Sequence, residues 1–368
     1  MAVAFIRRFT RNILFGLNIL LAIGFLLSAW LVNHSSPIGW LTGFAGLFLP
    51  YIILFLFLFL LFWLMAKPSF SLLSLIVLLI GWKQLKVLVA VKSIQPFSQI
   101  QQKETVRVAS WNLRGFNGVG KVAARTPLLK QQIADAITQY KPDIICLQEF
   151  NQSNQENHIA LFSRQYPYYF FAPDYQNKAG NYHSGCVIFS RWPIAATQRI
   201  PYPDAESLLY ADIVKGKDTL RVFTTHLCSF RFNHDDYEDL QKIGAAEEKG
   251  VEASKNIFRK MKIAFQRRER QAIIVRKKME ESPFPVILCG DFNDVPNSYT
   301  YHHITGAGLQ DAFIQSSAGI GRTYTSLAPT LRIDYILADM EWKVEQFGQV
   351  DEGLSDHFLL LADLKWEK

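Results

Sequence analysis

The first 90 residues constrain the fold most strongly, because they contain three long apolar segments, at residues 13–32, 38–66 and 70–91. A helix needs roughly 20 apolar residues to cross the hydrocarbon core of a membrane, and the first two segments meet that length. The third carries Lys83 and Lys86 in its second half, where an ammonium at mid-depth is costly unless it reaches the interface. A cleaved signal peptide fits the first segment poorly, since the apolar region is too long and no cleavage site follows it. We therefore expect an N-terminal bundle of about three transmembrane helices, the third of them marginal.

The charges around these segments predict the side of the membrane on which the rest of the chain lies. Cytoplasmic loops are enriched in Lys and Arg, and three arginines precede the first segment: Arg7, Arg8 and Arg11. Residues 33–37 contain no Lys or Arg, and Lys67 follows the second segment. Three crossings would place the residues after 92 outside the cytoplasm, as in a bacterial inner-membrane protein, and we favour this topology. If the third segment only lies along the interface, these residues are cytoplasmic, an outcome that three lysines favour: Lys83, Lys86 and Lys92.

After a polar segment at residues 93–104, which we interpret as a linker, short strands alternate with helices. Strands are expected at residues 106–111, 143–147, 185–190, 208–214, 220–226, 285–289, 332–338 and 358–364. Helical periodicity occurs at residues 128–140 and 233–282. Many short strands with few helices predict an α+β fold in which two packed sheets are covered by helices. We thus expect an anchor at residues 1–92 and a folded domain at residues 105–368.

Cysteine spacing and charge restrict the class of protein further. The four cysteines lie in or beside apolar runs and form no CxxC pair, so we expect buried free thiols and no zinc site: Cys146, Cys186, Cys228 and Cys289. The net charge is +7, and residues 242–278 contain twelve basic and four acidic side chains. This basic run could follow a nucleic-acid backbone, lie on anionic lipid or be an ordinary solvated helix face.

Six short polar motifs stand at the ends of the expected strands. They are Ser110-Trp-Asn112, Leu147-Gln-Glu149, Thr225-His226-Leu227, Gly290-Asp-Phe-Asn293, Arg332-Ile-Asp334 and Ser355-Asp-His357. In this order and at this spacing, residues 105–366 resemble the endonuclease/exonuclease/phosphatase superfamily, which has the deoxyribonuclease I-like fold and includes nucleases, sphingomyelinases, inositol polyphosphate 5-phosphatases and deadenylases. The resemblance implies a four-layer α/β/β/α sandwich of two mostly antiparallel sheets, and a metal-dependent phosphoric ester hydrolase.

Phosphoester hydrolysis explains why such residues are needed. Charge develops on the phosphoryl and leaving oxygens, and a hard dication with oxygen ligands neutralises it, so we expect Mg²⁺, with Mn²⁺ as an alternative. The resemblance implies three metal-binding residues: Asn112, Glu149 and Asp356. It implies five catalytic residues: His226, Asp291, Asn293, Asp334 and His357. Either Asp291 or His357 would be the base that activates water, and Asp334 would orient His357. Arg114 departs from the acidic residue that many exonuclease III-like members have there, and could hold a phosphate.

The expected function is hydrolysis of phosphodiester bonds by metal-assisted in-line attack of an activated water, with nucleic acid as the first substrate class. A sphingomyelinase-like or inositol-phosphate phosphatase activity at the membrane is the alternative enzyme interpretation. A catalytically silent membrane scaffold is the alternative of another class. Taken singly, each motif is also compatible with a structural role, such as a loop cap or an Asx turn.

Overall fold

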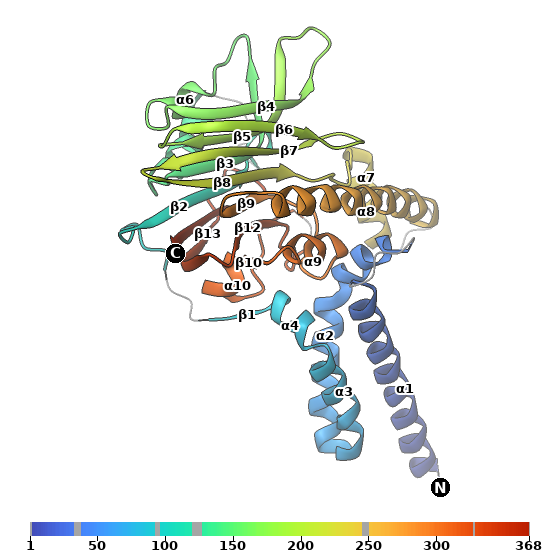
Figure 1. Cartoon of the computed structure of the whole chain (residues 1–368). Helices are drawn as coiled ribbons and strands as arrows, with labels where there is room; N and C mark the ends of the chain where they lie inside the picture. Colours follow the sequence, from blue (N-terminus) through green and yellow to red (C-terminus); the bar gives the residue numbers. More distant parts are fainter. Residues whose placement is uncertain are drawn as a thin grey trace.

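The computed structural model describes residues 2–32, 38–92, 96–119, 127–244, 250–326 and 328–367. The expected outer loop at residues 33–37 lies outside this part of the chain. The N-terminal region consists of four helices: α1 (Ala2–Leu31), α2 (Trp40–Ala66), α3 (Pro68–Ile80) and α4 (Trp82–Leu88). Helices α1, α2 and α3 pack side by side and project away from the rest of the molecule (Figure 1).

Two of these helices, α1 and α2, are long and apolar enough to span a membrane. The third expected span is not one helix: α3 and α4 are bent by 66° at Gly81, and α3 alone, at about 1.5 Å per residue, is only roughly 20 Å long. A Cβ at Gly81 would lie 1.9 Å from the Phe25 ring of α1. The absence of a side chain at Gly81 therefore allows α1 to contact the bend between α3 and α4. The bend directs the short α4, which carries Lys83 and Lys86, towards the sheets.

The outward faces of α1, α2 and α3 are covered with large apolar side chains, such as Leu20, Ile23 and Leu79, which are 65%, 57% and 63% exposed. A continuous apolar surface of this kind is stable in lipid and not in water. Between the helices, the buried Ser74 hydroxyl donates a hydrogen bond to Asn18 Oδ1 at 2.9 Å, a polar contact of the type that holds helices together in membranes. These features of the N-terminal region support membrane anchoring.

The rest of the chain contains two six-stranded sheets that pack face to face (Figure 1). The first sheet has, in spatial order, β13 (Trp342–Val350), β14 (Leu359–Trp366), β2 (Thr105–Asn112), β3 (Ile144–Ser153), β5 (Tyr182–Ser190) and β4 (Tyr168–Gln176). The second has β10 (Leu309–Asp311), β12 (Asp334–Asp339), β9 (Val286–Asp291), β8 (Asp218–His226), β7 (Ser207–Lys215) and β6 (Ile194–Pro201). The pairs β2–β3 and β8–β9 are parallel, and the others in these sheets are antiparallel.

Three apolar layers hold this arrangement together. Alternate strand residues such as Val108, Ile188 and Val222 fill the core between the sheets. Helices α5 (Pro127–Thr138) and α6 (Ala160–Ser163) cover the outer face of the first sheet. Helices α8 (Gly250–Glu280) and α9 (Tyr299–Thr305) cover that of the second. The expected α/β/β/α sandwich is thus confirmed, as are the four buried, unbridged cysteines.

The remaining elements are short or peripheral. They are η1 (Arg114–Phe116), α7 (His234–Gly244), α10 (Ala312–Ser316) and the two-stranded pair β1 (Ala90–Val91) and β11 (Ala318–Gly319). Through β1, the chain that leaves the membrane helices is bound to the sandwich. The segment that follows also lies against it, because the carbonyls of Ser98 and Gln99 accept hydrogen bonds from Arg107 at 3.0 and 2.9 Å.

We expect Arg107→Leu to lower the free energy of unfolding by about 3–5 kcal/mol, because it leaves a buried carboxylate without its partner. Arg107 and Asp363 are fully buried and form a two-pronged ion pair, with N–O distances of 2.7 and 2.8 Å. Urea titration of the detergent-solubilised protein, followed by tryptophan fluorescence, measures the loss. Lys343→Met is the control, because the Lys343 side chain is 54% exposed in its ion pair with Glu345, and no measurable change in the free energy of unfolding is expected. Equal effects of the two substitutions would contradict this assignment.

Candidate active site

Strand register brings the sequence motifs to one edge of the sandwich. Asn112, His226 and Asp291 are the last residues of β2, β8 and β9. Because β8 and β9 are parallel, His226 pairs in register with Asp291. Strand β12 runs antiparallel to β9, so its first residue, Asp334, also lies opposite Asp291. Side chains of four motifs therefore meet, and Asn112 and Asp291, which share a hydrogen bond, lie 179 residues apart in the chain.

Glu149 reaches this edge through an irregularity in β3. The pairing of β3 with β5 shifts register between Leu147 and Phe150, and Glu149 has a φ of 50°, a conformation that a non-glycine residue adopts at a cost. The Asn112 Nδ2 atom donates hydrogen bonds to Glu149 Oε1 at 3.2 Å and to Asp291 Oδ2 at 2.9 Å. Asn293 also has a positive φ, 51°, and its side chain donates to the Leu227 carbonyl at 2.9 Å.

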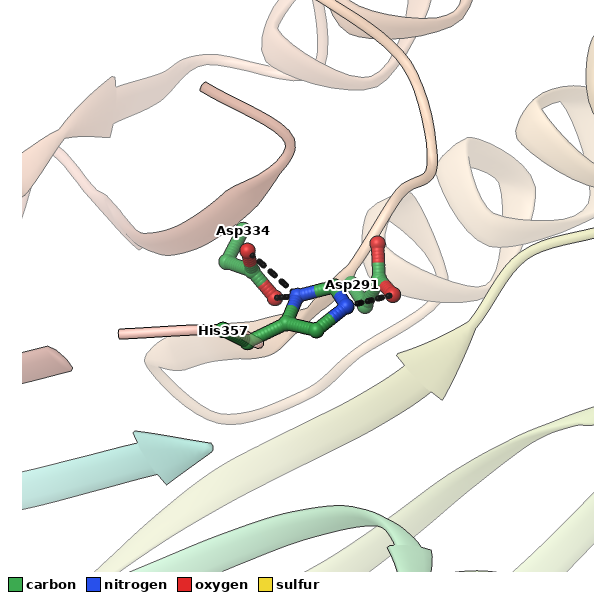
Figure 2. Close-up of side chains that lie close together, drawn as sticks. All are labelled: Asp291, Asp334 and His357. Atoms are coloured by element: carbon green, nitrogen blue, oxygen red, sulfur yellow. Dashed lines mark hydrogen bonds and ion pairs between the residues drawn. The ribbon is translucent and has the colours of Figure 1, made fainter. Parts of the chain in front are cut away.

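His357 is held between two carboxylates (Figure 2). Its Nδ1 atom lies 3.0 Å from both Asp334 oxygens, and its Nε2 atom lies 3.8 Å from Asp291 Oδ2. The Trp111 indole donates to the His357 carbonyl at 2.8 Å, and the Tyr324 ring packs on the imidazole at 4.8 Å between centroids. The imidazole thus has one fixed orientation.

Burial and neighbouring charge oppose each other in the pKa values of this site. Burial alone would lower the pKa of His357, but the carboxylates of Asp334 and Asp291 outweigh it and raise the pKa to about 10. Burial raises the pKa of Asp291, and the Asp334 carboxylate adds to the rise, while the two nearby histidines oppose it. Burial also raises the pKa of Asp356, against the effects of His357 and Arg114. At neutral pH the arrangement therefore favours a protonated His357 beside carboxylates.

Two overlapping groups of side chains have metal-ligand chemistry. In the first group, the Asn112 amide lies within hydrogen-bond distance of a carboxylate oxygen of Glu149 and of one of Asp291, and carboxylate and amide oxygens are the hard ligands that suit Mg²⁺. The Asn112 amide points its nitrogen at the carboxylates, and a half-turn about its last bond would present the oxygen instead. Asp291, Asp334 and His357 also lie close enough to share an ion. In this second group, however, the hydrogen bond between His357 Nδ1 and Asp334 is the usual arrangement of a histidine that is oriented by a carboxylate.

These side chains surround a cleft of about 330 Å³. The sequence-predicted residues that line it are Arg114, Glu149, His226, Asp291, Asn293, Asp356 and His357. Asn112 and Asp334 are buried just behind them. His226 Nε2 lies 3.6 Å from Asp291 Oδ2, and Arg114 Nε lies 3.4 Å from Asp356 Oδ2. The structure thus brings all nine predicted site residues to one place.

The cleft also contains residues that the motifs do not indicate. Apolar side chains from five separate segments also line it: Leu47, Phe230, Phe232, Phe265, Val295, Leu331 and Ile333. Tyr324 contacts His357 from a segment that has no sequence motif. Trp111, which supports His357 from behind, lies inside the first motif, so its position in the sequence indicated that it is near the site. For Leu47 and Tyr324 the sequence carries none, because each reaches the cleft only through tertiary packing.

Two family models match parts of the chain. A family model described as "Endonuclease/Exonuclease/phosphatase family" matches residues 109–357. A second, described as a domain of unknown function, matches residues 11–88. No curated protein matches the chain.

Among solved structures, an endonuclease/exonuclease/phosphatase from Beutenbergia cavernae is 20% identical, with a TM-score of 0.52 and coverage of 72% of each chain. That likeness concerns the fold. D. rerio TDP2 with a single-strand DNA product (17% identity, TM-score 0.48) and the Bacteroides thetaiotaomicron mannosyl-6-phosphatase Bt3783 (20%, 0.47) match 72% and 71% of this chain and all of theirs. From the family match over residues 109–357, the chain belongs to the endonuclease/exonuclease/phosphatase family of hydrolytic phosphoesterases.

Proposed function

We propose that the protein is a Mg²⁺-dependent phosphoesterase that hydrolyses phosphodiester bonds at a membrane. The observation that carries this proposal is the convergence of Asn112, Glu149 and Asp291 with the His357–Asp334 pair on one cleft. In this proposal, residues 105–368 are the catalytic domain, residues 1–92 the anchor and residues 93–104 the connection between them.

The cation would be held by Glu149 and Asn112, with Asp356 as a further ligand. Mn²⁺ has the same ligand preferences and could replace Mg²⁺. When bound, the cation neutralises the charge that develops on the phosphoryl oxygens. Arg114, which lies beside Asp356, would hold a further phosphate oxygen.

Of the two candidate bases, Asp291 fits better than His357. A histidine whose pKa is raised to about 10 already carries its proton at neutral pH and cannot accept another, whereas it can stabilise a phosphoryl oxyanion. Asp291, whose pKa is raised by burial, would accept a proton from water while the water oxygen bonds to phosphorus and the ester P–O bond breaks. Asn293 orients Asp291, because its backbone N–H donates to Asp291 Oδ1 at 2.7 Å. His226 would donate to the phosphate or the leaving oxygen.

The basic run on α8 gives little support to a nucleic-acid track, because many of its charges have acidic partners. Lys260 pairs with Asp236, Arg267 and Arg270 with Asp204, Arg276 with Glu280, and Lys277 and Lys278 with Glu281. Arg268 is fully buried. The part of the run that the structure describes is therefore closer to the third interpretation, an ordinary helix face. Lys249 lies outside the described residues, as do the side chains of Lys242 and Glu252.

Nucleic acid remains a candidate substrate, and a lipid or inositol phosphoester is the other. The second is favoured by one observation, the presence of Leu47 of the membrane helix α2 in the wall of the cleft. The scaffold hypothesis is weakened by the presence of a complete set of candidate ligands and acid–base groups.

Removal of divalent metal is expected to abolish hydrolysis of bis-p-nitrophenyl phosphate by the detergent-solubilised protein. The reason is that hydrolysis needs a dication at Glu149 to neutralise the charge that develops on the phosphoryl oxygens. EDTA should stop release of p-nitrophenolate, and Mg²⁺ added in excess of EDTA should restore it. Turnover that persists unchanged in EDTA would contradict the metal assignment, and absence of turnover under every metal tested would favour the scaffold.

The cleft is proposed to lie outside the cytoplasm. The N-terminus of α1 is at the end of the helices away from the sheets (Figure 1), so Arg7, Arg8 and Arg11 lie at that end. Lys67, between α2 and α3, lies there too, because the opposite end of α2 contacts α8 and α9. Positive charge at this end favours the cytoplasmic side for it. Protease added to intact cells, after removal of the cell wall, should then degrade the sandwich; complete protection would indicate the opposite orientation.

A further inference from the structure

The first turns of membrane helix α2 form part of the wall of the catalytic cleft. Leu47 lines the cleft and packs with Val295, Leu331 and Ile333. Val295 lies two positions after Asn293, and Ile333 directly precedes Asp334. The membrane helix therefore touches the same loops that carry the candidate catalytic residues.

This contact is fixed by close packing. The Tyr299 N–H donates to Thr42 Oγ1 at 3.0 Å. A Cβ at Gly43 would lie 2.0 Å from the Phe265 ring, and a Cβ at Gly46 would lie 2.9 Å from Val295. Because glycines permit this approach, α2 packs on the sandwich over its first two turns, and Leu47 has a defined place in the cleft.

The cleft is lined by two chemically different sets of side chains. The polar set includes Glu149, His226 and Asp291, where a phosphoryl group would react. The apolar set, called here the apolar wall, includes Leu47 and the contacting rings of Phe230, Phe232 and Phe265. Arg231, a cation on the cleft lining, is paired with Glu206 at 2.8 Å. A second phosphate of a nucleic-acid strand would face aromatic and aliphatic side chains on this wall, whereas a hydrocarbon chain would be stabilised by them.

The apolar wall continues into the membrane along α2. Tyr51, Leu54 and Leu58 follow Leu47 at intervals of four, seven and eleven residues, so they lie on the same face of the helix. All three are exposed, at 40%, 52% and 48%. A hydrocarbon chain in the bilayer could therefore lie along this face while its phosphoester occupies the cleft.

We propose that the substrate is a phosphoester of a membrane lipid, and that Leu47 and Phe232 bind the first part of its hydrocarbon chain. This inference rests on the proposed phosphoesterase function and specifies its substrate class. Water bonds to phosphorus and the ester P–O bond to the leaving group breaks. The proton that the water loses ends on the leaving oxygen. The hydrocarbon chain stays against the apolar wall until release.

The test compares two p-nitrophenyl phosphodiesters whose second substituent is either methyl or hexadecyl. The full-length protein is assayed with Mg²⁺ in dodecyl maltoside, a detergent without phosphate. We expect Leu47→Ala to lower the hexadecyl-to-methyl ratio of kcat/KM about tenfold relative to the native protein, because a shortened pocket wall discriminates by about this factor. Phe232→Ala, in the part of the cleft lining that precedes α7, should lower the ratio in the same direction. Partitioning of the long ester into micelles is identical for all variants and cancels.

Leu64→Ala is the matched control, since Leu64 is an exposed leucine of the same helix (51%) that does not line the cleft; its ratio should equal the native one. If neither Leu47→Ala nor Phe232→Ala changes the ratio while the methyl ester is turned over, the lipid inference is wrong and the proposed function stands. A single-stranded oligodeoxynucleotide hydrolysed with a higher kcat/KM than the hexadecyl ester would also overturn it. Absence of turnover of both esters by the native protein would refute the proposed function itself.

Discussion

Glu149→Gln is expected to reduce phosphodiester hydrolysis by roughly a thousandfold or more. The substitution keeps the size of the side chain but removes the charge that would bind the dication. A bound metal supplies several kcal/mol of transition-state stabilisation, and each 1.4 kcal/mol, approximately, is tenfold in rate. The measurement is kcat/KM for bis-p-nitrophenyl phosphate at saturating Mg²⁺, together with the Mg²⁺ concentration that gives half-maximal rate, which should rise.

The control for this prediction is Glu281→Gln, at the exposed end of α8, where the carboxylate pairs with Lys278 at 2.6 Å. Its kcat/KM should be native. Unfolding of the Glu149 variant should differ little from the native protein, because the side chain is 39% exposed. A Glu149→Gln protein with native activity and native metal dependence would show that the cation is not bound at this residue.

Asp291→Asn is expected to lower kcat by about 10²–10⁴-fold, the usual contribution of a general base. Asp291 is 1% exposed and accepts hydrogen bonds from Asn112 Nδ2 and from the Asn293 N–H. An asparagine has only one oxygen acceptor, so its NH₂ group would face the second of these two donors. A loss of about 1–3 kcal/mol in the free energy of unfolding should therefore accompany the kinetic effect. Activity is therefore measured well below the unfolding temperature of the variant.

Asp351→Asn, in an exposed loop, should change neither quantity. The comparison that decides between the two candidate bases is His357→Gln. The acidic limb of the pH–rate profile reports deprotonation of the general base. If Asp291 is the base, the Asp291 variant should lose this limb, whereas the His357 variant should keep it at a lower rate. The reverse pattern would assign the base to His357.

How far the sequence predicts the fold depends on how local each signal is. Buried strands such as β3 and β9 are continuous apolar runs and were anticipated. The four strands at the sheet edges were not: β4, β6, β10 and β13. Strand β6 is almost entirely exposed, so it shows no apolar alternation, and only pairing with β7 makes it a strand. The third apolar segment was expected as one span, but Gly81 and the packing of Phe25 divide it.

The sequence by itself determined the residue types that the chemistry needs and the apolar lengths that a membrane requires, because both are properties of short segments. It could indicate that Asn112, Glu149, Asp291 and His357 belong together, through the order of their motifs. Only the tertiary structure decided how they meet: the register of β9 against β12 sets Asp334 opposite Asp291. The same holds for Leu47, which lines the cleft because glycines in α2 permit close approach to the sandwich. Such contacts depend on residues some 250 positions apart, and no local pattern encodes them.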